Sequence, residues 1–200
     1  MQDTPPPGGS VLTLAVVFEG ALLVLAWGLG HLLSTPVGEQ IAVTPSTLLL
    51  GVLATVPLLA GLYWTLRTPW DVLVRLRVVI EDKVAPLFAG CSVAGLAVIS
   101  ILAGVGEEAL FRGVLQSAIA SNIGVVPALL VVSTLFGLVH PVTAVYAVMA
   151  GLIGLYLGVL TIWSGTLVPA MTAHALYDFV ALAYLVRRGR IQMESAPATD

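Results

Sequence analysis

The chain contains apolar stretches that are long enough to cross a lipid bilayer. Residues 11–33 carry only Glu19 and His31 as acidic, basic or histidine side chains, and residues 86–186 carry only six. A helix crosses the hydrocarbon core with about 20 predominantly apolar residues. Of the 200 residues, 58% are hydrophobic and 10% are charged, whereas a soluble domain carries about 25% charged residues. The sequence therefore predicts an all-α, polytopic bundle of transmembrane helices.

The apolar stretches divide the chain into about six spans with bent or broken helices around a central site. Residues 1–10 are polar and proline-rich, which predicts a disordered tail. Residues 11–83 predict two spanning helices, at 11–33 and 45–66, and an interfacial amphipathic segment at 67–83. Residues 84–121 are too long for one straight crossing, and the glycines within them predict a bend. Three further spans are expected at 125–139, 142–163 and 167–186, before a loose polar tail at 187–200.

Basic residues flank two segments of the chain and predict its orientation. Cytoplasmic segments of membrane proteins are enriched in Lys and Arg. The first segment carries Arg67, Arg75, Arg77 and Lys83, and the second carries Arg187, Arg188 and Arg190. Both termini are therefore expected in the cytoplasm, with the chain in a plasma membrane of bacterial type. Straight helices on this plan place His140 and His174 at different depths, so either some helices are broken or re-entrant, or the orientation is reversed.

Composition excludes some functions. The net charge of −3 is dispersed, with no basic stripe, and no nucleic-acid partner is expected. Cys91 is the only cysteine, so no intramolecular disulfide forms, and we interpret it as a small buried apolar residue. Glu19 and His31 are interpreted as bundle-facing or interfacial side chains. Gly154 and Gly158 have GxxxG spacing, which favours close helix packing over substrate contact.

The six acidic, basic and histidine residues of residues 86–186 form three clusters: Glu107, Glu108 and Arg112, then His140, then His174 and Asp178. A charge at the centre of a membrane helix costs about 2.5–3.5 kcal/mol on the insertion scale, so such residues normally turn inward and pair. Glu108 and Arg112 are four residues apart, which predicts an ion pair on one helical face. Glu107 is rotated by about 100° from that face and is the freer acid, a candidate general base. A purely structural Glu–Arg pair with a spare acid is the alternative.

The other two clusters supply imidazoles. Phe136 and His140 share a helical face, and Pro141 is expected to end or kink that helix. His174 and Asp178 share a face in the same way, and each cluster alone is compatible with simple packing. Together the three clusters can deprotonate a water and stabilise an oxyanion, or bind a divalent metal such as zinc. The sequence has no HExxH, GxSxG or Walker A motif, which disfavours the corresponding zinc, serine and nucleotide chemistry.

The order EExxxR, FxxxH and HxxxD on apolar helices resembles the CPBP family, which comprises CAAX prenyl proteases and bacteriocin-processing or Abi-type intramembrane proteases. The matching residues are Glu107, Glu108, Arg112, Phe136, His140, His174 and Asp178. The resemblance covers residues 84–186, which it marks as the catalytic helix core.

The resemblance implies hydrolysis of peptide bonds in a membrane-associated protein or peptide. By analogy, Glu107 assisted by His140 activates water, His174 and Asp178 stabilise the oxyanion, and Glu108, Arg112 and Phe136 support the site. The glutamate mechanism requires no cofactor, whereas a metalloprotease mechanism would use Glu107, His140 and His174 as zinc ligands.

Many members of the family have Asn where this chain has Asp178. An ionised carboxylate cannot donate to an oxyanion, so Asp178 is either protonated, orients His174, or binds a metal. Two other functions are compatible with the sequence: a non-catalytic binding or bacteriocin-immunity protein of the same fold, and a small ion-coupled transporter. The absence of paired inverted repeats disfavours the transporter.

Overall fold

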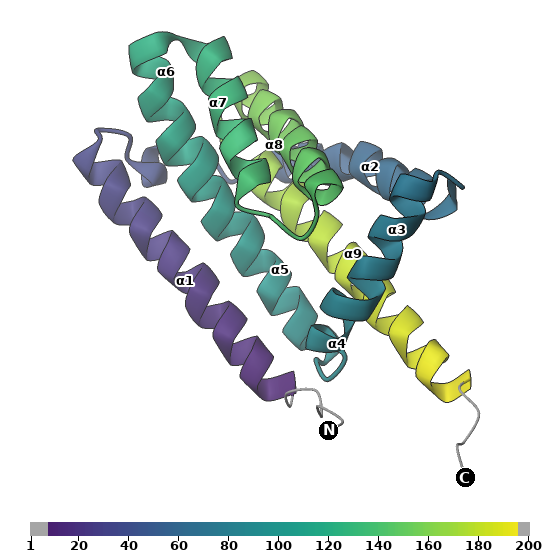
Figure 1. The fold of residues 1–200 in the computed structure, drawn as a ribbon. Helices are drawn as coiled ribbons and strands as arrows, with labels where there is room; N and C mark the ends of the chain where they lie inside the picture. Colours follow the sequence, from purple (N-terminus) through teal and green to yellow (C-terminus); the bar gives the residue numbers. More distant parts are fainter. Residues whose placement is uncertain (1–7, 196–200) are drawn as a thin grey trace.

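A computed structural model describes residues 8–195, and this part of the chain is helical with no strand (Figure 1). The helices are α1 (Gly8–Leu32), α2 (Pro45–Arg67), α3 (Asp71–Val79), α4 (Ala85–Phe88), α5 (Val93–Glu108), α6 (Ser117–Ile123), α7 (Val125–Leu138), α8 (Ala144–Ser164) and α9 (Val168–Ser195). A 3₁₀ turn, η1 (Val37–Gln40), and two π-helical segments, η2 (Ile80–Val84) and η3 (Ala109–Gln116), complete the order. The predicted all-α polytopic fold is confirmed.

Five helical segments of the described chain are long and apolar enough to cross a membrane, rather than the six predicted. They are Gly9–Leu32, Pro45–Arg67, Val93–Ile123, Ala144–Ser164 and Val168–Gly189. The missing span is α7, whose 14 residues extend about 21 Å. That length is shorter than the hydrocarbon core of about 30 Å. The chain is nevertheless an integral membrane protein by the number and hydropathy of the remaining helices.

The long central helix is continuous through the glycines where a bend was predicted. It starts at Val93 rather than near residue 84, because the chain turns at residues 89–92 and the Ser92 hydroxyl caps α5 by accepting from the Gly95 N–H at 3.0 Å. α5 then passes through η3 into α6 without interruption. A Cβ atom placed on Gly104 would lie 2.7 Å from the backbone nitrogen of Ala175 on α9. The glycine therefore allows α5 and α9 to pack closely, and the predicted bend was wrong.

The central helix widens into π geometry directly after the acidic pair. η3 spans Ala109–Gln116 and includes Arg112. π-helical turns insert an extra residue per turn, are rare, and occur mostly at functional sites. Most side chains of this segment are buried, including Phe111 and Val114. The π-helical segment η3 thus directly follows the acidic pair and contributes Phe111 and Val114 to a buried apolar cluster.

The short helix α7 brings the second motif back beside the first. Gly124, with φ of 92°, lies between α6 and α7 and reverses the chain, a backbone conformation that favours glycine. About as many residues separate Gly124 from His140 as separate it from Glu107. Because both segments are helical over nearly all of that length, His140 returns to the level of Glu107. This removes the mismatch in depth that straight, full-length helices imposed.

α9 occupies the centre of the bundle and packs against α5, α2 and α8 (Figure 1). α1 packs against α5 and η3, and α7 packs against α8. The apolar core forms three clusters: one around Val114, Val132 and Phe136, one around Leu58, Leu157 and Ala170, and one around Cys91, Leu96 and Ile99. The prediction that Cys91 is buried is confirmed, since 3% of its surface is exposed.

The ends of the bundle differ from the predicted loose tails. α1 already begins at Gly8 and α9 continues to Ser195, so residues 8–10 and 187–195 are helical. The rest of both predicted tails, residues 1–7 and 196–200, lies outside the described residues. The start of α1 and the end of α9 lie at the same end of the bundle (Figure 1).

The segment between α2 and α5 is amphipathic, as predicted. α3 buries Leu73 and Leu76 and exposes Arg75. Arg77 donates to the carbonyl oxygens of Thr65, Leu66 and Thr68, which lie at the carboxyl end of α2. The guanidinium therefore satisfies carbonyl groups that an α-helix leaves without internal partners, and it fixes α3 over the end of α2.

Candidate active site

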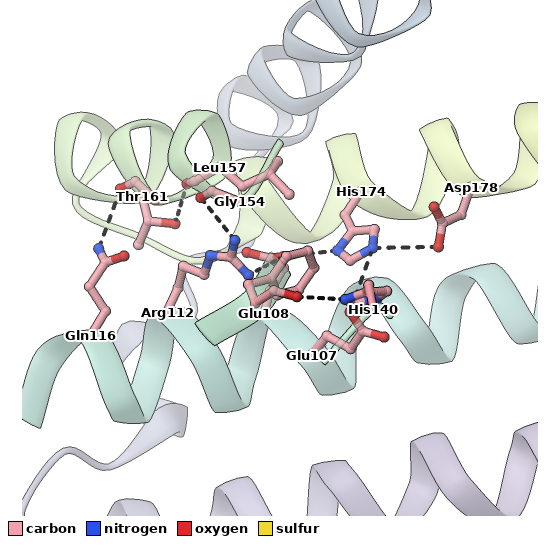
Figure 2. Close-up of polar contacts among 12 residues, drawn as sticks. Glu107, Glu108, Arg112, Gln116, His140, Gly154, Leu157, Thr161, His174 and Asp178 are labelled. Carbon is pink, nitrogen blue, oxygen red and sulfur yellow. Dashed lines mark hydrogen bonds and ion pairs between the residues drawn. The ribbon is translucent and has the colours of Figure 1, made fainter. Parts of the chain in front are cut away.

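The predicted ion pair between Glu108 and Arg112 is present and fully buried. Arg112 Nη1 donates to Glu108 Oε1 at 3.0 Å, and neither side chain has measurable exposure (Figure 2). Arg112 Nη2 donates to the carbonyl oxygen of Gly154 at 2.9 Å. The guanidinium carbon lies 4.4 Å from the centre of the Phe136 ring, within the range of a cation–π interaction. Arg112 thus joins η3, α7 and α8.

Gln116 extends this connection by one turn and was missed in the sequence. Its Nε2 donates to the carbonyl oxygen of Gly158 at 3.4 Å, one turn after Gly154 on α8. A Cβ atom on Gly158 would lie 2.5 Å from Leu129 Cδ1, which confirms the close packing predicted for the GxxxG pair. Glu108, Arg112 and Gln116 are each four residues apart. This spacing of four residues is the sequence pattern that could have identified Gln116.

His174 lies against Glu108 through one ring nitrogen and faces the cavity acids through the other. Its Nδ1 is 2.8 Å from Glu108 Oε1. Its Nε2 is 3.4 Å from Asp178 Oδ2 and 4.0 Å from Glu107 Oε2. An ionised carboxylate only accepts hydrogen bonds, so the Glu108 contact places a proton on Nδ1. The ring is therefore oriented by Glu108, with Nε2 directed at the other two carboxyl groups (Figure 2).

His140 follows the end of α7, as the position of Pro141 predicted. Its Nδ1 lies 2.7 Å from the carbonyl oxygen of Phe136. A carbonyl oxygen only accepts, so Nδ1 carries the hydrogen and Nε2 of the neutral ring has a free lone pair. Nε2 is 3.8 Å from Glu107 Oε2. The Phe136 ring packs against both imidazoles, with centroids 4.7 Å from His140 and 6.0 Å from His174, so one aromatic side chain positions both rings.

Glu107 is the carboxyl group that the two imidazoles share. Within the described residues its Oε2 is buried and makes no hydrogen bond. The distances of 3.8 Å and 4.0 Å to the two Nε2 atoms exceed a direct hydrogen bond and suit groups joined through one small molecule. Glu107 thus differs from Glu108, which is occupied by Arg112 and His174.

These side chains line a cavity of about 360 Å³ inside the bundle. Glu107, His140, His174 and Asp178 lie on its wall, and the remaining wall is mostly apolar. Glu19 of α1 also lines this cavity. The prediction that Glu19 faces the bundle is confirmed. His31 lies in the last turn of α1, exposed and with its ring 5.6 Å from that of Trp27, and does not line the cavity.

The zinc hypothesis requires at least three ligand atoms directed at one point about 2.0–2.3 Å away. Among the residues that the structure describes, no three His, Cys, Asp or Glu side chains are grouped in this way. His174 directs Nδ1 at Glu108, and its Nε2 lies beside Asp178. As arranged, Glu107, His140 and His174 do not fit a zinc ion.

The fold and these side chains define a class: a polytopic helical membrane protein with an acid–histidine cavity inside the bundle. Residues 89–180 match the family model described as "Type II CAAX prenyl endopeptidase Rce1-like". This segment contains all seven motif residues, and the match supports the resemblance to CAAX proteases that the motifs predicted. Neither the curated proteins nor the solved structures contain a match to the chain.

Proposed function

We propose that the chain is an intramembrane endopeptidase that hydrolyses a peptide bond of a membrane-associated protein or peptide, with Glu107 as the general base. One observation carries this assignment: Glu107 Oε2 is buried, unpartnered within residues 8–195, and faced by two imidazole nitrogens at 3.8 Å and 4.0 Å. The match to a CAAX protease family model supports the reaction type.

Glu107 and His140 activate the attacking water together. An ionised Glu107 and the Nε2 lone pair of His140 are both acceptors, so they do not bond to each other. A water placed between them donates one O–H to each and directs its oxygen lone pair at the scissile carbonyl. As the water oxygen attacks the carbonyl carbon, its proton passes to Glu107, which is general base catalysis.

His174 stabilises the oxyanion that this attack creates. As an imidazolium, His174 donates from both ring nitrogens: Nδ1–H to Glu108 at 2.8 Å, and Nε2–H into the cavity. Asp178 Oδ2 lies 3.4 Å from Nε2, so it holds this N–H by a long contact before the reaction and releases it to the oxyanion. We therefore assign Asp178 the orientation of His174, the second of the three roles open from the sequence.

Collapse of the intermediate completes the reaction. The carbonyl re-forms, the C–N bond breaks, and the proton held by Glu107 passes to the departing nitrogen. The products are a carboxylic acid and an amine, with Glu107 returned to its ionised form. Glu108, Arg112 and Phe136 act as support, because they fix His174 and His140 without reaching the cavity oxygen of Glu107.

The substrate is proposed to be a peptide with a prenylated cysteine near its carboxyl terminus. The matching family model is described as a CAAX prenyl endopeptidase. The cavity suits such a ligand chemically, because it continues from the acids past Leu62, Ile80 and Leu185 along a mostly apolar wall. An isoprenoid chain would gain free energy by leaving water for this lining.

Replacing Glu107 by Gln tests the proposal. Glu107→Gln keeps the size of the side chain but cannot accept the proton of water, so cleavage of a fluorogenic farnesylated peptide should fall by about 10²–10⁴-fold. The matched control is Glu39→Gln, which changes an exposed glutamate in η1 and should cleave as the wild type does. Full activity of Glu107→Gln would refute the assignment.

Two additional measurements separate the alternatives. Metal analysis of active wild-type protein, with a chelator in the cleavage assay, tests the zinc mechanism. Loss of activity with chelator and recovery with zinc would contradict the metal-free proposal. Protection against a bacteriocin that survives loss of both Glu107 and His140 would favour a binding protein over a protease.

A further inference from the structure

Glu19 interrupts the apolar face through which α1 packs on the rest of the bundle. Leu12 and Ala15 pack on the cluster around Cys91 and Ile99, and Leu22, Leu23 and Ala26 belong to or pack on the cluster around Ala109 and Phe136. Glu19 lies between these two sets, with helical spacing from both. An acid therefore stands on this face between two apolar clusters.

Glu19 is buried, lines the catalytic cavity and has a carboxyl oxygen without a partner among the described residues. Its side chain is 9% exposed, and Oε2 makes no hydrogen bond within the described residues. Glu19 lines the cavity that also contains Glu107, His174 and Asp178. A buried, unpartnered carboxyl is costly unless a ligand satisfies it.

The backbone of α1 is held close to the general base. A Cβ atom on Gly106 would lie 2.9 Å from the carbonyl oxygen of Glu19. Gly106 directly precedes Glu107, so this contact holds α1 against α5 at the level of Glu107. α1 lies outside residues 89–180, the segment that matches the protease family. The family match therefore assigns Glu19 no role.

The charges of the cavity indicate which ligand Glu19 would bind. Five carboxyl groups lie in or beside it, those of Glu19, Glu81, Glu107, Glu108 and Asp178. Of the two guanidinium groups, Arg77 on the cavity wall is already bound by carbonyl oxygens at the end of α2, and Arg112 beside the cavity is bound by Glu108 and the Gly154 carbonyl. The site thus has an excess of acid that a cationic ligand would complement. Peptide hydrolysis generates such a cation, because the amine released from the substrate becomes an ammonium group in water.

We propose that Glu19 binds the ammonium group of the carboxyl-terminal cleavage product, through the carboxyl oxygen that makes no hydrogen bond within the described residues. This inference rests on the proposed peptidase function. α1 then forms a wall of the product site, next to Glu107, which passes its proton to the departing nitrogen. Product recognition at Glu19 would thereby be separate from the oxyanion role of His174.

Binding of a model product tests the proposal without turnover. The probes are the tripeptide valyl-isoleucyl-methionine with a free amino group and its N-acetylated form, titrated calorimetrically into the full chain in detergent. Wild-type protein should bind the free amine roughly 10- to 100-fold more tightly, as expected for a charged hydrogen bond. Glu19→Gln should remove this preference and leave the affinity for the acetylated peptide unchanged.

Two variants control the measurement. Leu22→Ala weakens apolar packing on the same face of α1 and should keep the preference for the free amine. Glu19→Asp retains a carboxyl group on a shorter side chain and should keep part of the preference for the free amine. If Glu19→Gln does not fold, Glu19→Asp tests the proposal in its place. The proposal is overturned if wild-type protein binds neither peptide or binds both equally well. It is also overturned if Glu19→Gln still prefers the free amine. Failure of the peptidase function is seen separately, as absence of cleavage by wild-type protein.

Discussion

Glu107 and Glu108 are neighbours in the sequence but have different chemical environments. Glu108 is fully buried and bound by Arg112 at 3.0 Å and His174 at 2.8 Å. Glu107 lines the cavity, with its nearest imidazole nitrogens at 3.8 Å and 4.0 Å. A rotation of about 100° per residue separates the two side chains. One helix thus presents a paired carboxylate to the core and, to the cavity, the carboxylate that we propose as the general base.

At the residue scale, loss of the guanidinium should destabilise the fold. Arg112→Met leaves the buried Glu108 carboxylate without its cation, so the free energy of unfolding should fall by about 3 kcal/mol. Equilibrium unfolding in mixed detergent micelles measures this change. Arg75→Met, at an exposed position on α3, is the control and should unfold like the wild type. Equal stability of Arg112→Met and the wild type would contradict a structural role for the pair.

At the element scale, the site depends on how closely α9 approaches α5. Gly104 lies on the face of α5 that meets Met171 and Ala175 of α9. His174 and Asp178 are on the same helix, so the separation of the two helices sets the distance from His174 to Glu107. The glycine therefore fixes the geometry of the site from a position outside it.

A single methyl group on this face should disturb both stability and activity. Gly104→Ala places its Cβ 2.7–2.9 Å from atoms of Ala175 and Met171, which should cost about 1–3 kcal/mol and slow cleavage. Gly61→Ala is the matched control, because a Cβ there meets nothing within 4 Å. On helix propensity alone, it should be neutral or slightly stabilising. Unfolding and cleavage assays on both variants measure the difference, and normal activity of Gly104→Ala would count against the close-packing explanation.

At the scale of the whole molecule, the fold gathers both basic segments at one end. Arg188 Nε lies 3.1 Å from Glu81 Oε1, which joins the end of α9 to η2. The helical ends at Gly8 and Ser195 lie at that same end (Figure 1). We therefore predict that the two ends of the described chain face the same side of a membrane.

Reporter fusions test the orientation. Because Lys and Arg are enriched on the cytoplasmic side, a fluorescent protein that folds only in the cytoplasm should be active at either terminus. Alkaline phosphatase, which requires export, should be inactive at both. Opposite results at the two termini would contradict the arrangement of the helices, and export of both would reverse the predicted orientation.

The sequence by itself determined the fold class, the resemblance to CAAX proteases and the clustering of the charged residues in the apolar helices. Charged side chains are so costly in an apolar helix that their presence there predicts inward-facing clusters. Spacing of four residues predicted the Glu108–Arg112 pair because the period of an α-helix is a local property. These predictions needed no knowledge of which helices are neighbours.

Only the tertiary structure decided how the clusters meet. The short α7 returns His140 to the level of Glu107, Gly104 serves close packing rather than a bend, and Glu19 joins the cavity from a helix outside the family match. Each depends on contacts between residues far apart in the chain. Hydropathy and helical period describe one helix at a time and carry no information about which helix lies opposite. The relative placement of helices, and therefore the membership of the site, is fixed by packing alone.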